Sequence, residues 1–267
     1  MTDAAARPSQ ALTYTSYLAL DEILGAQRPR SDEHDEMLFI VIHQVYELWF
    51  KELLHELRHL QSRLEASDTP HAVQTVHRVL TIFKVAVAQI DVLETMTPRQ
   101  FTQFRRRLDA ASGFQSAQFR ELEVTLGRRD DRIAGHYLKG SAARQRIATA
   151  ASRPSLYDSF LRYLAAHGYP VPRELLERDV REPAQPSAEL QKVLLQVYRD
   201  DGGCAQAAER LVDVDQLFQE WRYRHVKMVE RTIGAKIGTG GSAGVPYLRS
   251  TLFVPMFPDL WAVRAEL

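Results

Sequence analysis

The chain has 267 residues, 45% of them hydrophobic and 25% charged, which is ordinary for a globular protein with room for a core that encloses a cofactor. Its 34 basic and 34 acidic residues give a formal net charge of zero, so the composition argues against nucleic acid or an anionic membrane surface as a partner. A single cysteine, Cys204, excludes an intramolecular disulfide and a cysteine-rich metal site, and it fits a reducing, cytoplasmic setting.

The N-terminus lacks a charged segment followed by an apolar run, so we expect no signal peptide. No stretch approaches the roughly 18 apolar residues of a membrane span. These observations predict a cytoplasmic enzyme or binding protein, without choosing between the two.

Apolar spacing predicts helices along most of the chain, where glycine and proline are sparse. We expect long helices at about 35–66, 71–95, 115–126 and 204–233, and shorter helices at about 155–166 and 187–199. We find no strand pattern and no repeat. The proline-rich stretch from Arg153 to Pro186 predicts a small helical excursion, at about 153–200, from a single all-α domain over residues 1–267.

The first long helix carries a histidine on its apolar side. At ~100° per residue from Phe39, one broad arc holds the apolar and aromatic residues, and His43 falls inside that arc. A buried imidazole needs a partner, because an unsatisfied polar group costs about 1–3 kcal/mol. The arc consists of Ile42, Tyr46, Trp49, Phe50, Leu53, Leu57, Leu60 and Leu64.

The same helix contains His55-Glu56-Leu57-Arg58-His59, which matches the HExxH pattern of zinc proteases. Its two imidazoles share one face, as a zinc site requires. That face lies opposite the apolar arc, so we expect His55 and His59 to point to solvent. The pattern is therefore better explained as a chance match in an amphipathic helix.

The last long helix repeats the arrangement around His225. Trp221 lies one turn before it on the same face, and Met228 and Val229 lie one turn after it. Such a histidine is a plausible axial ligand, because heme needs a dry pocket and one imidazole. A histidine on an apolar face is more often a hydrogen-bonded core residue, so spacing alone leaves both interpretations open.

A glycine-rich loop, IGTGGSAG, follows this helix from Ile237 to Gly244. A phosphate loop would end in GK[ST] and follow a strand, and this loop does neither. A plain connector is the commoner explanation for such a sequence.

Five segments, in order, cover nearly the whole chain: TYTSYLALDEILGAQ (Thr13–Gln27), DEMLFIVIHQVYELWFKELLHEL (Asp35–Leu57), FRRRLDAASGFQSAQFRELE (Phe104–Glu123), WRYRHVKMVERTIG (Trp221–Gly234) and GTGGSAGVPYLRSTL (Gly238–Leu252). Together they resemble the tryptophan 2,3-dioxygenase family, with the weakest similarity around Arg153–Pro186. The resemblance implies a helical heme-binding bundle with long antiparallel helices, an N-terminal segment contributed to a neighbouring subunit, assembly as a homotetramer, and one heme b (iron protoporphyrin IX) per subunit.

Each site residue then acquires an implied role. His225 resembles the axial ligand of the heme iron, and His43 resembles the distal histidine that accepts a hydrogen bond from the indole N–H. Arg105 resembles the residue that grips the substrate carboxylate. Thr239 resembles the group that binds the substrate ammonium and carboxylate. The substrate wall is implied to consist of Phe39, Ile40, Val41, Ile42, His43, Phe101 and Leu108.

Four further positions match the family. Ser112 and Gly113 resemble residues near the heme edge and bound oxygen, and Tyr14 and Tyr17 resemble aromatic residues that reach a neighbouring subunit's site. Phe101 stands where some members have tyrosine, so Arg105 would carry more of the carboxylate recognition here.

The implied activity is cleavage of the indole C2–C3 bond of L-tryptophan by O2, giving N-formyl-L-kynurenine, the first step of tryptophan degradation by the kynurenine route. One alternative is a related heme enzyme that adds one oxygen atom to another aromatic compound. A non-catalytic sensor of heme or tryptophan is a second, and a zinc hydrolase is a third.

Overall fold

The computed structural model of the chain describes residues 11–109, 111–130, 135, 137–234, 236 and 244–267. Within these ranges every regular element is a helix and no strand occurs, which confirms the predicted all-α class. None of the described helices is both long and apolar enough to cross a membrane.

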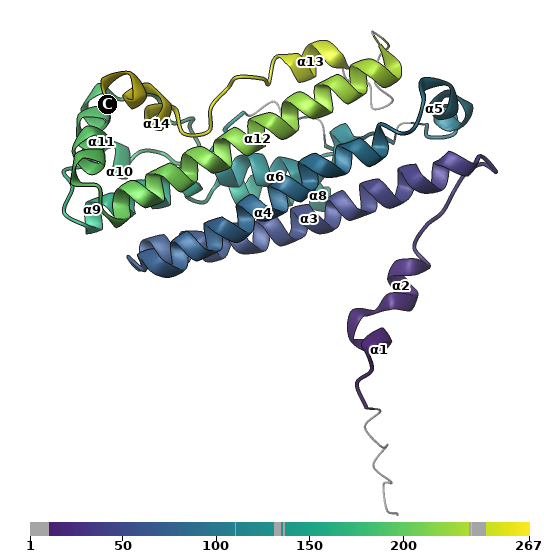
Figure 1. Cartoon of the computed structure of the whole chain (residues 1–267), viewed down its shortest axis with the longest axis horizontal. Coiled ribbons are helices and arrows are strands. Elements are labelled where there is room, and N and C mark those ends of the chain that lie inside the picture. Colours follow the sequence, from purple (N-terminus) through teal and green to yellow (C-terminus); the bar gives the residue numbers. More distant parts are fainter. Residues whose placement is uncertain (1–10, 110, 131–134, 136, 235, 237–243) are drawn as a thin grey trace, which may run out of the picture.

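Three long helices lie side by side and form the body of the molecule: α3 (His34–Glu65), α4 (Thr69–Leu93) and α12 (Gly203–Ile233) (Figure 1). Cross-contacts define their directions. Gln89 of α4 donates to the carbonyl of Ile42, and Arg78 pairs with Glu56, so α4 runs antiparallel to α3. The ring pair Phe83–Phe218 and the ion pairs of Arg224 and Arg231 with Glu94 make α12 parallel to α4.

The apolar arcs predicted on these helices form the core. Leucines spaced along α3 are essentially inaccessible, and the predicted faces of α4 and α12 meet them, so burial of apolar side chains drives the packing. Trp49 is only half-buried. His55 and His59 are exposed as expected, and no group of three candidate metal ligands occurs among the described residues.

Shorter helices pack around the body (Figure 1). They are α6 (Ala117–Leu126), α8 (Ala142–Ala151), α9 (Leu156–Ala166), α10 (Arg173–Leu176), α11 (Ala188–Asp200), α14 (Pro258–Ala262) and the 3-10 turn η2 (Val263–Glu266). Buried carboxylates join these elements: Asp259 accepts from Tyr157, Ser187 and Gln191. Asp215 of α12 accepts from the backbone N–H groups of residues 256 and 257 and from Trp261, which fastens the C-terminal segment.

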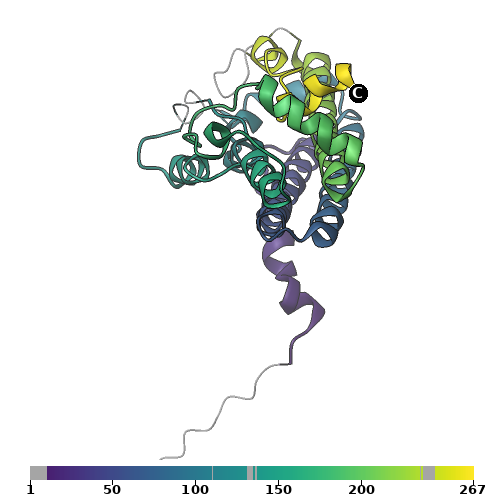
Figure 2. The ribbon, with the colours of Figure 1, turned by 90° about the vertical axis from the view of Figure 1, so that its left-hand side faces the viewer.

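The N-terminal helices α1 (Tyr14–Leu18) and α2 (Leu20–Leu24) form an arm that leaves the body (Figures 1 and 2). Neither helix has a buried residue. The arm is joined to α3 where Gln27 donates to Gln44. Tyr14 and Tyr17 are 76% and 72% exposed, so in a single chain these aromatic side chains lie in solvent.

All six helices predicted from apolar spacing are confirmed, with ends within two residues of those expected. Several helices were not predicted, among them α5 (Pro98–Arg105), α13 (Val245–Arg249) and the 3-10 turn η1 (Gly113–Gln115). They are too short to show a period, and side-chain caps stabilise α5 and η1. In α5, Pro98 opens the helix while Thr97 and Gln100 exchange capping hydrogen bonds.

Candidate functional site

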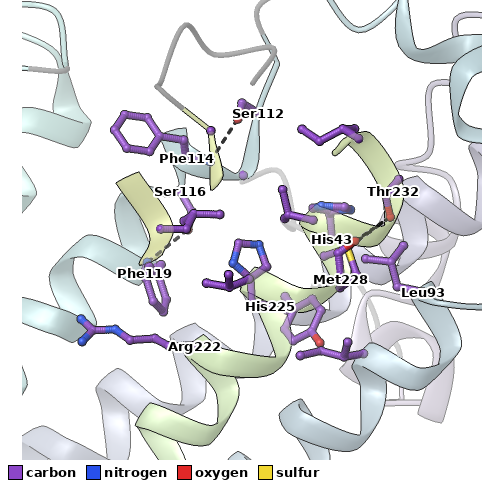
Figure 3. A pocket seen from close by; sticks show the side chains of 18 of the residues that line it. His43, Leu93, Ser112, Phe114, Ser116, Phe119, Arg222, His225, Met228 and Thr232 are labelled. Atoms are coloured by element: carbon purple, nitrogen blue, oxygen red, sulfur yellow. Dashed lines mark hydrogen bonds between the residues drawn. The ribbon is translucent and has the colours of Figure 1, made fainter. Parts of the chain in front are cut away.

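A cavity lies where α3, α4 and α12 meet α5, the start of α6 and α13 (Figure 3). Its walls are mainly aromatic and aliphatic side chains, including Phe39, Phe50, Phe119, Trp221 and Val229. Such an enclosed apolar space with few polar groups is the usual form of a site for a cofactor or a small aromatic ligand.

His225 reaches the cavity from α12, as predicted from its helical face (Figure 3). Its ring stacks on that of Trp221, with centroids 5.1 Å apart and planes 6° apart. Among the described residues it has no hydrogen-bond partner. Burial, with the nearby His43 and Arg120, lowers the pKa of His225 to about 4. The ring is therefore neutral at physiological pH, and a lone pair is available to a metal.

His43 reaches the same cavity from α3. Its Nδ1 lies 2.7 Å from the carbonyl oxygen of Phe39, one turn earlier. A carbonyl can only accept, so Nδ1 carries the proton and Nε2 is left as an acceptor. Burial lowers the pKa of His43, although the bond to Phe39 and the charge of Glu47 oppose the shift. This histidine is a neutral acceptor facing an apolar space.

An aromatic cluster surrounds His43. The ring of Phe39 lies 4.1 Å from that of His43 and 5.7 Å from that of Phe101, measured between centroids. Phe101 and Arg105 are both on α5, Leu108 follows that helix, and all three line the cavity. A cationic side chain and an aromatic wall are thus brought together.

Ser112 and Gly113 line the cavity at the start of η1. The Ser112 hydroxyl caps this turn by accepting from the Phe114 N–H. A Cβ placed on Gly113 would meet no atom within 4 Å, so the described structure imposes no steric demand for glycine there.

Other predicted positions lie elsewhere. Ile40, Val41 and Ile42 are absent from the cavity wall: Val41 is 38% exposed and Ile42 belongs to the core. Successive helical residues are turned by ~100°, so only Phe39 and His43, one turn apart, face the cavity. Tyr14 and Tyr17 lie on the arm, away from the cavity of their own chain.

Thr239 lies outside the described residues. Two described glycines, Gly234 before it and Gly244 after it, have unusual backbone angles. Gly234 ends α12 with φ 59° and ψ −135°, and Gly244 precedes α13 with φ 65° and ψ −131°. Only glycine adopts this backbone region without strain. The glycines thus set how the chain leaves α12 and enters α13, whose Tyr247 and Leu248 line the cavity.

Sequence reasoning missed a buried ionic cluster at the cavity, hereafter the Glu123 cluster: Glu123 with Arg120, Arg128 and Arg222. Glu123 Oε2 lies 2.6 Å from Arg120 Nη1, and Oε1 lies 2.5 Å from Arg222 Nη2 and 3.2 Å from Arg128 Nη1. Burial alone would raise the pKa of Glu123, but attraction to Arg120, Arg222 and Arg128 lowers it. An i, i+3 Arg–Glu pair usually marks a solvated helix face, so its spacing gave no sign of burial.

The residues around His225 fit a heme. Coordination of heme iron requires a neutral imidazole in a dry cavity, and His225 provides one that no described residue engages. The apolar walls, formed by Phe119, Trp221 and neighbouring aliphatic side chains, suit a large apolar ligand. Arg120 and Arg222 add buried positive charge for an anionic group.

Comparison with known proteins agrees with this geometry. The family model described as tryptophan 2,3-dioxygenase matches residues 1–150 and 187–267, leaving out the stretch that holds α9 and α10. The chain is 63% identical over 267 residues to the tryptophan 2,3-dioxygenase of Anaeromyxobacter sp. (strain K), with all of both chains covered. It is 64% identical to that of Anaeromyxobacter dehalogenans, again over the full length of both chains. It is 56% identical to that of Herpetosiphon aurantiacus, over 97% of this chain and all of the relative.

Proposed function

The chain belongs to the tryptophan 2,3-dioxygenase family, and we propose that it catalyses the reaction L-tryptophan + O2 → N-formyl-L-kynurenine. Both oxygen atoms enter the product as the indole C2–C3 bond is cleaved, in the first step of tryptophan degradation. One observation carries the proposal. A neutral His225, without a hydrogen-bond partner among the described residues, lines the same apolar cavity as His43, whose Nε2 can accept a hydrogen bond.

His225 holds the iron of one heme b per subunit through its free imidazole lone pair. When bound, the heme supplies the binding and activation of O2. The apolar walls keep water away from the reacting groups, and Trp221, stacked on His225, fixes the plane of its ring.

His43 orients the indole of the substrate. The bond from Nδ1 to Phe39 leaves Nε2 free to accept the indole N–H, and the ring of Phe39 supplies an aromatic wall beside it. A neutral acceptor suits this role, because a protonated imidazole could only donate. Phe101 and Leu108 complete the apolar wall around the indole.

Arg105 binds the substrate carboxylate through its planar guanidinium group, and Thr239 binds the ammonium and carboxylate groups. The support for Arg105 is its place on the cavity wall with Phe101 and Leu108. Ser112 and Gly113, on the same wall, would lie near the edge of the heme when it is bound. Specificity for a free amino acid follows, because a ligand without a carboxylate would lose this bidentate pair.

The functional form is a cytoplasmic homotetramer in which the N-terminal arm of one subunit completes the site of another. The arm supports this assembly, because Tyr14 and Tyr17 are exposed on helices that bury nothing in their own chain. The single, buried Cys204 is compatible with a reducing compartment.

The test is mass spectrometry of products from reduced, heme-loaded protein given L-tryptophan under isotopically labelled O2. N-formylkynurenine with two labelled atoms is the expected result. A product with one labelled atom would identify a monooxygenase instead. Binding of heme and tryptophan without oxygen consumption would identify a sensor.

A further inference from the structure

The Glu123 cluster carries more positive than negative charge. Three guanidinium groups surround Glu123, and the only other carboxylate that the described contacts place on the cluster is Asp130, 3.8 Å from Arg128. Among the described residues, one positive charge is therefore left over. Arg120 and Arg222 are 5% and 3% exposed, so water does little to stabilise it. A buried unbalanced charge is costly, which points to an anionic ligand.

The arginines differ in how their N–H groups are used. Arg222 donates from Nη2 to Glu123 and from Nη1 to the carbonyl of Thr251. Arg128 divides its two terminal nitrogens between Glu123 and Asp130, and it is absent from the cavity wall. Arg120 lines the cavity, and among the described residues its one ion pair is with Glu123.

The position of Arg120 is set by contacts on several sides. Its guanidinium carbon lies 5.0 Å from the ring centre of Phe114 and 6.0 Å from that of Tyr247, both on the cavity wall. Glu123, one turn later on α6, fixes one edge of the guanidinium. Burial raises the pKa of the Tyr137 hydroxyl, and the charge of Arg120, together with a side-chain hydrogen bond to it, opposes the shift, so Tyr137 lies beside this guanidinium as well.

We propose that Arg120 binds a propionate carboxylate of the porphyrin, and that Glu123 is the positioning residue that holds Arg120 in place. The inference rests on the proposed heme function. A porphyrin presents a flat apolar ring and two carboxylates at one edge, which matches an apolar cavity with a guanidinium at one end. Arg120 and Arg105 reach the cavity wall from different helices, α6 and α5, so Arg120 is available to the porphyrin while Arg105 serves the amino acid.

The test compares two ligands that differ only in these carboxylates: hemin and hemin dimethyl ester. Apoprotein is titrated with each, and the dissociation constant is measured from the Soret band and from quenching of tryptophan fluorescence. The variants are Arg120→Gln, Arg120→Lys and the control Arg78→Gln. Arg78 is an exposed arginine that also pairs with a buried glutamate, Glu56, but it lies outside the cavity wall.

The wild type and Arg78→Gln should bind hemin roughly 10- to 100-fold more tightly than the ester, as expected for a charge-assisted hydrogen bond. Arg120→Gln should lose this preference while its affinity for the ester stays unchanged. If Arg120→Gln does not fold, Arg120→Lys takes its place, and its preference should fall because lysine lacks the planar fork.

Three results would overturn the inference: equal binding of hemin and ester by the wild type, equal weakening of both ligands by Arg120→Gln, or an unchanged preference in Arg120→Lys. If the ester binds as well as hemin and the loaded protein makes N-formylkynurenine, only this inference fails. If neither porphyrin binds the wild type, the proposed heme function fails with it.

Discussion

Replacing Glu123 with glutamine removes one buried negative charge and keeps the shape of the side chain. Glu123 is 1% exposed, and its two oxygens accept from Arg120, Arg222 and Arg128 at 2.5–3.2 Å. Glutamine retains one acceptor oxygen but turns the other into an amide that faces a guanidinium. Breaking a buried ion pair by removing one partner costs about 3–5 kcal/mol, because the remaining charge stays buried and unpaired. We expect Glu123→Gln to lower the free energy of unfolding of the apoprotein by this amount.

The neighbouring Glu121 is the matched control on the same helix. Its side chain is also buried, but its partners Arg58 and Arg146 have side chains 55% and 53% exposed. Water can solvate these cations when the pair is broken, so Glu121→Gln should cost no more than about 1 kcal/mol. For a chain of this size the melting temperature should fall by roughly 6–20 °C in Glu123→Gln and by less than about 4 °C in Glu121→Gln.

The pH dependence gives a second check on Glu123. Its folded-state pKa is lowered, so its stabilisation is fully present above the unfolded-state value near 4.5 and is lost as the pH falls below that value. The difference in free energy of unfolding between the wild type and Glu123→Gln should therefore become smaller below about pH 4.5. Denaturant unfolding followed by circular dichroism, at one protein concentration, measures all three proteins. Equal stability of Glu123→Gln and Glu121→Gln would refute the burial of this charge cluster.

Three further substitutions test the assigned roles. His225→Ala should lose heme or its normal Soret spectrum, and an unaltered spectrum would remove His225 as the ligand. Arg105→Ala should raise KM for L-tryptophan strongly at normal heme content; unchanged steady-state kinetics would contradict carboxylate binding. His43→Ala should slow turnover by a factor of about 2–13, since a hydrogen bond to neutral indole contributes about 0.5–1.5 kcal/mol. The pKa of His43 is lowered by burial, so kcat/KM should stay level as the pH falls to 6.5. If kcat/KM of the wild type falls while the pH is still above 6.5, and His43→Ala does not show this fall, His43 is not a neutral acceptor.

Much of the site was predictable because it lies on long helices. A period of 3.6 residues places every position of a long helix on a face, so His43 and His225 were expected among apolar residues, where the structure has them. Ile40, Val41 and Ile42 belong to the matching segment as well, but in the single chain only Phe39 and His43 of this group line the cavity.

The amino-acid sequence alone determined the all-α class, the six periodic helices and the faces of the two histidines, because these depend on local spacing and propensity. Only the tertiary structure decided that α6 inserts Arg120 and Glu123 beside Arg222, more than ninety residues away on α12, in a place without water. Only it showed that Nδ1 of His43 is engaged by Phe39, so that Nε2 is the acceptor. Burial and hydrogen-bond partners depend on which distant elements pack together, and a single chain's pattern of residue types does not specify those contacts.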